Sequence, residues 1–427
     1  MKISLKLMVI GMLVGLTWSC SGMMEDLVAK GAAYQTELDK TGDQRMAEQK
    51  ARVADSEIGI DRGNIARTGV YPASGIIPKG NLKWRFKLVG DIENKRPSTP
   101  IIVKDKVYFS GADDNLYCLD FNKGRKIWMT GHGKDPRGER FTQSPTIVDL
   151  YVFAYKRPNI EVGMYHADKG HYVGGLKGKR GLSDFSPVGS PLFIDNKVFI
   201  VSHTFNPSIY SFTTNPTDTL WRFQLPGHDI GGGAAYDNGI VYVSSTEGIF
   251  AVDAQSGILK WEKQLMHLRG ILTPAIANGI VYLPAYVGRV YALDAVTSEV
   301  IWTFKPEIEN AGNYLLFNNA VTVLDNIVLV SAHEDQYRIL DAKTGEELWN
   351  IDLRDNENDK NHIVTPASSA DGIGYFADDK GKIEAWDLAT RERLWTFTVE
   401  GSIKSAPAIY KGVVFVSSTD GYIYAIE

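Results

Sequence analysis

The chain has 427 residues, of which 44% are hydrophobic and 11% aromatic, and its formal net charge is −5. This composition can form a large packed core, which excludes the disordered and coiled-coil classes of protein. A mildly acidic chain without a basic stripe also argues against nucleic acid as the main partner. We therefore expect a folded protein that binds no nucleic acid.

The N-terminus has the shape of a secretory signal. Two lysines precede an apolar run from Leu7 to Leu16, which is too short to span a bilayer as a permanent helix. The segment resembles a lipoprotein-type signal peptide over residues 1–19, with Cys20 as the lipidated first residue of the mature protein. An ordinary signal peptide with an incidental cysteine is the alternative. Ser21 favours an exported protein anchored to the outer membrane, in the periplasm or at the cell surface.

Residues 20–80 are predicted to form a polar tether and a lead-in loop. The stretch up to about Ile60 is free of proline and highly charged, which suits either a partly helical tether or a flexible spacer. The following run, Asp61-Arg-Gly-Asn-Ile-Ala-Arg-Thr-Gly-Val-Tyr-Pro72, is rich in turn-forming residues. It therefore predicts a loop before the first strand.

From residue 81 onward the sequence repeats with a period of 40 to 48 residues. Each repeat carries an aspartate that is followed eight residues later by a tryptophan. Five copies keep both residues: Asp120 and Trp128, Asp253 and Trp261, Asp294 and Trp302, Asp341 and Trp349, Asp387 and Trp395. Two copies differ in one of the two residues: Asp168 is followed eight residues later by Leu176, and Thr213 is followed by Trp221. The last copy stops at Glu427, where its aspartate would be, and Trp84 from the N-terminal side of the repeats supplies its tryptophan. This period is typical of propeller blades, and the copies number eight.

Within each repeat, turn signals divide the sequence into four short strands. A Ser/Thr-Pro pair such as Thr273-Pro274 opens the first strand, and an Asn-Gly turn such as Asn278-Gly279 leads to the second. The third strand ends at the aspartate and the fourth carries the tryptophan. We therefore predict an all-β fold, an eight-bladed β-propeller of four-stranded antiparallel blades over residues 81–427. An N-terminal strand near Trp84 should complete the last blade and close the ring.

The recurrent tryptophans have a packing explanation. A small residue in one blade leaves room for a large indole, and burying one contributes on the order of 5 kcal/mol as an upper estimate. The predicted blade-docking residues are Trp84, Trp128, Trp221, Trp261, Trp302, Trp349 and Trp395. Cys118 occupies a small-residue position of the repeat and is predicted to be a buried free thiol.

No sequence motif predicts catalysis or a metal site. The chain contains no Gly-x-Ser-x-Gly, His-Glu-x-x-His or P-loop pattern. Acidic pairs recur at the same turn between the second and third strands, so we interpret them as turn residues rather than calcium ligands. They are Asp113-Asp114, Glu334-Asp335 and Asp378-Asp379.

Basic or imidazole side chains recur in the connections between blades. In a propeller these connections lie on one face and lead to the innermost strands, so the side chains could converge on the mouth of the central channel. The predicted basic rim consists of Arg96, Arg140, His228, Arg269, His362 and Lys404. Such a rim would attract an acidic partner segment or a small anion. Solvated loop charges without a shared target are the alternative.

The pattern Ala-x-Asp-x-x-x-Gly-x-x-x-Trp is complete at residues 251–261 and nearly complete at 118–128 and 341–349. It resembles the tryptophan-docking repeats of pyrroloquinoline-quinone-type propellers, and the resemblance covers roughly residues 81–427. In WD40 propellers, by contrast, the tryptophan and aspartate are adjacent. Among propellers of this type, the quinone-dependent dehydrogenases carry two adjacent cysteines over the cofactor and a calcium site. This sequence has no adjacent cysteines, so we expect no cofactor.

A propeller of this type behind a lipoprotein signal is similar to the BamB family of outer-membrane assembly lipoproteins. The resemblance implies a non-catalytic, membrane-anchored scaffold that is monomeric within a complex and whose partner is an outer-membrane barrel insertase. A quinone- or metal-dependent oxidoreductase is one alternative. A surface lipoprotein that binds glycans or peptides is another, with the candidate aromatic residues Tyr155, Phe205, Tyr286, Tyr314 and Phe317.

Overall fold

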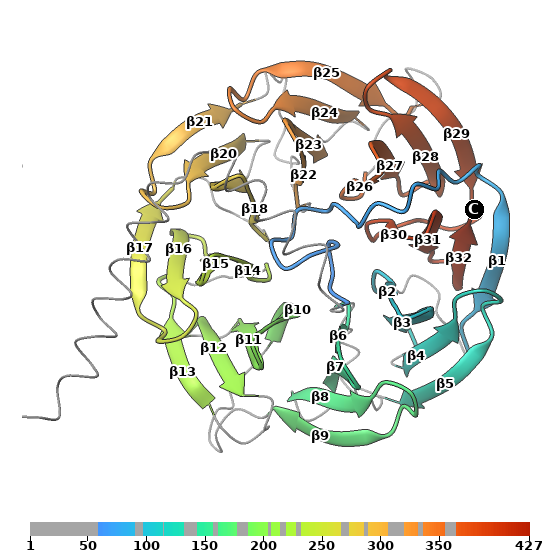
Figure 1. Cartoon of the computed structure of the whole chain (residues 1–427), viewed down its shortest axis with the longest axis horizontal. Helices are drawn as coiled ribbons and strands as arrows, with labels where there is room; N and C mark the ends of the chain where they lie inside the picture. Colours follow the sequence, from blue (N-terminus) through green and yellow to red (C-terminus); the bar gives the residue numbers. More distant parts are fainter. Residues whose placement is uncertain are drawn as a thin grey trace, which may run out of the picture. The chain divides into compact units, whose positions relative to one another are not determined.

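A computed structural model describes fourteen segments of the chain, and the predicted lipidation site Cys20 lies outside them. They are residues 59–89, 97–113, 115–131, 143–156, 161–176, 187–203, 206–213, 219–227, 232–265, 273–285, 289–305, 320–331, 336–354 and 364–427. These segments form strands and turns without an α-helix, and the strands make eight sheets arranged in a ring (Figure 1). None of the described residues forms a helix long and apolar enough to cross a membrane.

The first four blades follow one another along the chain, each running from the central channel outward. Blade 1 contains β2 (Ile101–Val103), β3 (Lys106–Ser110), β4 (Asn115–Asp120) and β5 (Lys126–Gly131). Blade 2 contains β6 (Thr146–Val148), β7 (Tyr151–Lys156), β8 (Glu161–His166) and β9 (Tyr172–Leu176). Blade 3 contains β10 (Pro187–Ile194), β11 (Lys197–Ser202), β12 (Ser208–Thr213) and β13 (Thr219–Gln224). Blade 4 contains β14 (Ala235–Asp237), β15 (Ile240–Ser244), β16 (Gly248–Asp253) and β17 (Leu259–Gln264).

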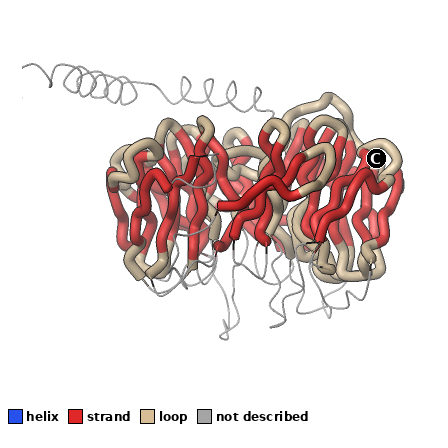
Figure 2. The backbone as a smooth tube through the Cα atoms, turned by 90° about the horizontal axis from the view of Figure 1, so that it is seen from below, coloured by secondary structure: helices blue, strands red, loops and turns tan. Residues whose placement is uncertain are grey.

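The remaining blades continue the ring, which Figure 2 shows from the side. Blade 5 contains β18 (Ala275–Ala277), β19 (Ile280–Ala285), β20 (Arg289–Asp294) and β21 (Val300–Phe304). Blade 6 contains β22 (Thr322–Leu324), β23 (Ile327–Ser331), β24 (Gln336–Asp341) and β25 (Glu347–Asp352). Blade 7 contains β26 (Ser368–Ala370), β27 (Ile373–Ala377), β28 (Lys382–Asp387) and β29 (Glu392–Thr398). Blade 8 contains β30 (Ala408–Tyr410), β31 (Val413–Ser417), β32 (Tyr422–Ile426) and β1 (Leu82–Lys87).

Both ends of the propeller meet in blade 8. Strand β1 is its outermost strand and pairs antiparallel with β32, so that Arg85 lies opposite Tyr424. Beyond the strands, the backbone groups of Asn81 and Glu427 exchange two hydrogen bonds of 2.8 Å. The predicted eight-bladed fold and its closure by an N-terminal strand are confirmed.

Hairpin turns follow the chemistry of the sequence. Asn238 and Gly239 both have positive φ angles, 48° and 80°, as the two-residue turn between β14 and β15 requires. The middle strands are buried on both faces, because each blade packs between two neighbours, whereas the outermost strand β17 alternates between half-buried and exposed residues. The core is therefore divided among the interfaces between blades.

Most of the recurrent tryptophans join their blade to the next one. The indole nitrogen donates a hydrogen bond to a carbonyl oxygen at the turn that follows the third strand of the adjacent blade. These bonds link Trp84 to Phe121, Trp128 to Ala167, Trp221 to Ala254, Trp261 to Ala295 and Trp302 to Ala342, at 2.8 to 3.2 Å. Blades 1, 4 and 5 therefore present both a donor and an acceptor to their neighbours.

The glycine of the repeat provides the surface on which the indole packs. A β-carbon on Gly345 would lie 2.6 Å from the ring of Trp302, and Gly345 has a φ angle of 75°. Arg391 takes the glycine position opposite Trp349, and its guanidinium group lies 5.6 Å from the centre of that ring. Cys118 is a buried free cysteine, as predicted, and burial raises the pKa of its thiol to about 12.

Candidate functional site

Residues 59–71, here called the plug, cross the central channel at one end (Figure 1). The innermost strand of each blade has one edge free to pair, and the plug supplies hydrogen-bond partners to five of these strands. The backbone hydrogen bonds join Gly59 to Ile147, Ile65 to Tyr236, Ala66 to Ile276, Thr68 to Val323, and Gly69 and Tyr71 to Ser369, at 2.8 to 3.0 Å. The lead-in loop predicted from the sequence is therefore part of the folded ring.

Arg62 extends from the plug toward blades 6 and 7. Its guanidinium group donates to the carbonyl oxygens of Ala367 at 2.7 Å and Val321 at 3.0 Å, and to the hydroxyl of Thr322 at 2.7 Å. Gly69 is required beside it, because a β-carbon there would lie 2.3 Å from a guanidinium nitrogen. Burial lowers the pKa of Arg62, yet a guanidinium keeps its proton in proteins, so a positive charge lies inside the channel mouth.

Arg67 makes the corresponding contacts on the opposite side of the channel mouth. It is buried, and it donates to the carbonyl oxygens of Ala234 at 3.2 Å and of Ser190 and Asp61 at 2.9 Å. Burial lowers its pKa, while the nearby Asp61 raises it. The two arginines thus join blades 3, 4, 6 and 7 through the plug, and sequence analysis did not identify them.

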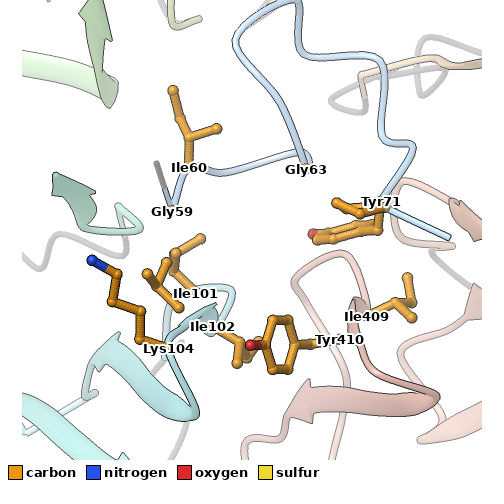
Figure 3. Close-up of a pocket in the computed structure, with 11 residues that line it drawn as sticks. Gly59, Ile60, Gly63, Tyr71, Ile101, Ile102, Lys104, Ile409 and Tyr410 are labelled. Atoms are coloured by element: carbon orange, nitrogen blue, oxygen red, sulfur yellow. The ribbon is translucent and has the colours of Figure 1, made fainter. Parts of the chain in front are cut away.

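A cavity of about 250 Å³ lies between the plug and the innermost strands of blades 1 and 8 (Figure 3). The plug contributes Gly59, Ile60, Gly63 and Tyr71 to its wall. Strands β2 and β30 and their turns contribute Ile101, Ile102, Lys104, Ile409 and Tyr410. The cavity is mostly apolar, with the polar atoms of two tyrosines and one lysine around it.

The predicted basic rim is only partly within the described residues. Lys404 is described, and its ammonium group lies 3.3 Å from a carboxylate oxygen of Asp379. This lysine is therefore paired with an acidic residue of its own chain. The other five members lie outside the described residues, and for them the rim stays a prediction: Arg96, Arg140, His228, Arg269 and His362.

Among the described members of the acidic pairs, Asp113 and Asp378 behave as turn residues, and Asp379 pairs with Lys404. One carboxylate oxygen of Asp378 accepts hydrogen bonds from the backbone N–H groups of Lys380 and Lys382, both at 2.9 Å. Asp114, Glu334 and Asp335 lie outside the described residues. Among the residues that the structure describes, no three His, Cys, Asp or Glu side chains are grouped so as to hold a metal ion.

Of the aromatic residues considered for glycan binding, Tyr155 is the one within the described residues. Tyr155 is partly buried against the core between blades 2 and 3, and its hydroxyl donates to the carbonyl oxygen of Gly189. It is therefore a packing residue rather than an exposed platform. The other four candidates fall outside the described ranges: Phe205, Tyr286, Tyr314 and Phe317.

A family profile matches nearly all of the propeller. The family described as outer membrane protein assembly factor BamB matches residues 75–216, 205–362 and 334–427. The chain belongs to this family. The solved structure of BamB from Moraxella catarrhalis has the same fold, with a TM-score of 0.60 at 15% identity, over 81% of this chain and 96% of that one.

Curated relatives include both assembly factors and enzymes. The BamB of Shewanella oneidensis is 20% identical over 79% of this chain and 86% of its own length. A tetrathionate hydrolase from Acidithiobacillus ferrooxidans is 23% identical over 84% of this chain and 72% of its own length. A quinohemoprotein alcohol dehydrogenase from Comamonas testosteroni is 29% identical over 37% of this chain, which spans only 24% of that enzyme.

The described end of the channel is occupied by groups of the chain itself. Arg62 and Arg67 donate to carbonyl groups at or next to the innermost strands, and the plug backbone pairs with strands of the same set. The sequence has two cysteines, Cys20 and Cys118, and no adjacent pair. The BamB-family propeller therefore uses this end of its channel for its own N-terminal segment.

Proposed function

We propose that this protein is a non-catalytic scaffold of outer-membrane β-barrel protein assembly, with a barrel insertase as its partner. The observation that carries the proposal is the family match, which continues from residue 75 to the C-terminus and so includes all eight blades. The S. oneidensis relative, itself a BamB, is similar over most of both chains. The connections between the blades differ in sequence, and connecting loops commonly carry binding residues.

The proposal includes a lipid anchor on Cys20, which places the propeller at the outer membrane, in the periplasm or at the cell surface. Mass spectrometry of the purified protein should find the diacylglyceryl group on the peptide that begins at Cys20. A Cys20→Ser variant should lose this mass and should leave the membrane fraction. An unmodified cysteine in membranes would instead support the ordinary signal peptide.

Absence of catalysis and of a cofactor is part of the same proposal. The plug and its two arginines support it, since they occupy one end of the channel with groups of the chain itself. The enzyme alternative is best tested directly. Purified protein should bind no quinone in an absorbance titration, and should not consume tetrathionate, the substrate named for the A. ferrooxidans relative.

Affinity purification tests the partner. Because Glu427 pairs with Asn81 and Lys83 in the closing blade, the tag should follow Glu427 through a flexible linker. Membranes solubilised in mild detergent should yield a barrel insertase in near-stoichiometric amount, whereas an unrelated exported lipoprotein with the same tag should not. Recovery of only a redox or glycan-handling partner would overturn the assembly role.

A further inference from the structure

The outer edges of blades 8 and 1 form one basic surface, here called the basic wall. It consists of residues 79–88, which include β1, and residues 122–131, which include β5. These two stretches contain seven lysine and arginine residues and no aspartate or glutamate, although the net charge of the whole chain is −5. Strands β2, β3 and β4 separate them in the sequence, so a basic stripe becomes visible only in the folded ring (Figure 1).

Closure of the ring brings the two stretches together. The indole nitrogen of Trp84 in β1 donates to the carbonyl oxygen of Phe121 at 2.8 Å. Gly124 lies against the same indole, where a β-carbon would be 2.5 Å from the ring. The ammonium group of Lys83 lies 5.9 Å from the centre of the Phe121 ring. The basic turn before β5 therefore lies directly beside β1.

Most of the positive charge of the basic wall is uncompensated. Lys83 forms an ion pair with Glu427. Arg85 and Lys87 lie over the ring of Tyr422, at 4.8 and 5.8 Å from its centre, and keep their charges there. Six exposed cations of the wall form no ion pair within the described part of the chain: Lys79, Arg85, Lys87, Lys123, Arg125 and Lys126. A surface of this kind attracts anions.

The repeat itself does not require cations at these positions. Two of the positions follow the glycine of the repeat turn, and one lies three residues after the tryptophan. Blade 6 has Glu346, Glu347 and Asp352 where the basic wall has Arg125, Lys126 and Lys87. The charge is therefore a property of this part of the ring, and the fold accepts acidic residues in the same places.

Exposed aliphatic side chains lie among the cations. Leu82 of β1 is 46% exposed, and Ile127 and Met129 of β5 are 44% and 39% exposed. Lysine and arginine attract the phosphate groups of anionic lipids, and aliphatic side chains are stabilised at the boundary between headgroups and acyl chains. The basic wall offers both contributions on the outside of the ring, where an extended membrane surface can reach them.

We propose that the basic wall binds the surface of a membrane that contains anionic phospholipids. The lipid phosphates pair with the free cations of β1 and of the turn before β5, and the three aliphatic side chains enter the interface. This role goes beyond the scaffold function and does not depend on it, because it needs neither a partner protein nor a lipid on Cys20.

The experiment is vesicle flotation with residues 49–427. This part of the chain is one compact unit that contains the plug and all eight blades and lacks Cys20. Vesicles of one part phosphatidylglycerol and two parts phosphatidylcholine should bind it at least about 10-fold more tightly than vesicles of phosphatidylcholine alone, because several cations contribute. The difference should be largely lost on raising the salt from about 0.1 to 0.5 M, since salt screens the attraction.

A charge-reversed variant tests the location of the site. The triple variant Lys87→Asp, Arg125→Glu and Lys126→Glu gives the basic wall the residues that blade 6 has at the same positions, so it should melt like the unsubstituted protein. It should bind the anionic vesicles at least about 10-fold more weakly. The matched control makes the same change in net charge at exposed positions of other blades, with Lys169→Glu, Lys305→Glu and Lys343→Glu, and should bind as the unsubstituted protein does.

Three results would each overturn the proposal: equal binding to the two kinds of vesicle, unchanged binding by the charge-reversed variant, or an equal loss in the control. Binding to polyglutamate but not to vesicles would also overturn it, since the basic wall would then serve an acidic protein segment. Recovery of an insertase is a separate result and bears only on the scaffold role.

Discussion

The indole nitrogen of Trp395 donates a hydrogen bond of 2.8 Å to the carbonyl oxygen of Pro78, 317 residues earlier in the chain. In five blades a tryptophan is received by the turn after the third strand, whereas the described residues of blade 8 provide no such turn. The N-terminal segment replaces that turn, and Gly80 lies against the indole, where a β-carbon would be 2.9 Å from the ring. The segment before β1 therefore contributes a docking surface as well as a strand.

Removing residues 81–88 should open the ring. The deletion takes away β1, its pairing with β32 and the indole of Trp84, which is buried against Phe121. We expect the melting temperature to fall by roughly 5 to 10 °C or more. Differential scanning calorimetry of the purified protein measures this change.

The matched control replaces residues 81–88 with the sequence of residues 258–265 from blade 4. That segment has the same Leu-Lys-Trp core and the same strand position in its own blade. The replacement should restore most of the melting temperature, because the pairing and the indole return. A deletion that melts like the wild type would show that the ring does not depend on β1.

Trp302 offers a test of a single blade contact. Its side chain is buried and donates to Ala342 of the next blade, so Trp302→Ala should lower the free energy of unfolding by about 3 to 5 kcal/mol. Chemical denaturation monitored by circular dichroism measures the loss. Ile301→Ala is the control, because this neighbour is 46% exposed, and its effect should stay within about 0.5 kcal/mol. Equal effects of the two variants would contradict the docking role of the indole.

The blade count and the closure were predictable because each repeat carries its own signals. The spacing of Asp253 and Trp261, for example, marks the third and fourth strands of one blade, and Asn238-Gly239 marks the turn between the first two. These signals are local, and they recur in register along the chain. Because these signals repeat, a fold of many strands could be predicted from one sequence.

The plug was not predictable in the same way. Arg62 contacts Ala367, which is 305 residues away, and Arg67 contacts Ala234, which is 167 residues away. A segment that pairs with the innermost strands of distant blades has no periodic pattern of its own, so its turn-forming residues indicated only a loop. Two arginines within a run of small residues, directly before a repeat array, are the signal that could have suggested a buried role.

Arg67 should be needed for the stability of the channel mouth. In Arg67→Met, the apolar stem is retained, but the carbonyl oxygens of Ser190 and Ala234 lose their donor. We expect a loss of about 2 kcal/mol or more in the free energy of unfolding, and faster hydrogen exchange in β10 and β14. Urea denaturation and exchange mass spectrometry measure the two effects.

Lys79→Met is the control for Arg67→Met, because Lys79 is an exposed residue of the same N-terminal segment. It should change neither the unfolding free energy nor the exchange of β10. Arg67→Lys should fall between the wild type and Arg67→Met, since an ammonium group cannot reach carbonyls on two blades in the way that a guanidinium does. Exchange rates that match the wild type in Arg67→Met would contradict the role of this arginine in holding the plug.

The aspartates at the repeat turns should make stability depend on pH. The pKa of Asp341 is lowered, chiefly by the backbone N–H of Thr344, which donates to it at 2.8 Å, and Asp387 has the same arrangement with Thr390 at 2.9 Å. For Asp253, burial raises the pKa, but hydrogen bonds from Ser256 outweigh it and the pKa is lowered. A pKa that is lower in the folded state means that the ionised form stabilises the fold.

This stabilisation is present above the unfolded pKa of about 3.9 and is lost as the pH falls through the lower folded values. A triple variant with Asn at positions 253, 341 and 387 keeps the hydrogen-bond acceptors but not the charges. It should be less stable than the wild type at pH 7, and the difference should narrow as the pH falls from about 5 to 3. Urea denaturation across this pH range measures the difference in unfolding free energy between the variant and the wild type. The contributions of the other titrating groups are the same in both proteins and cancel in this difference.

A triple variant with Ala at the same three positions separates the charge from the hydrogen bonds. Alanine removes the acceptor itself, and a protonated aspartate still accepts through its carbonyl oxygen. The gap between the wild type and the Ala variant should therefore persist as the pH falls, while the gap to the Asn variant narrows. If the Asn variant instead differed from the wild type by the same amount at pH 7 and pH 3, the ionised carboxylates would not be the source of the stability.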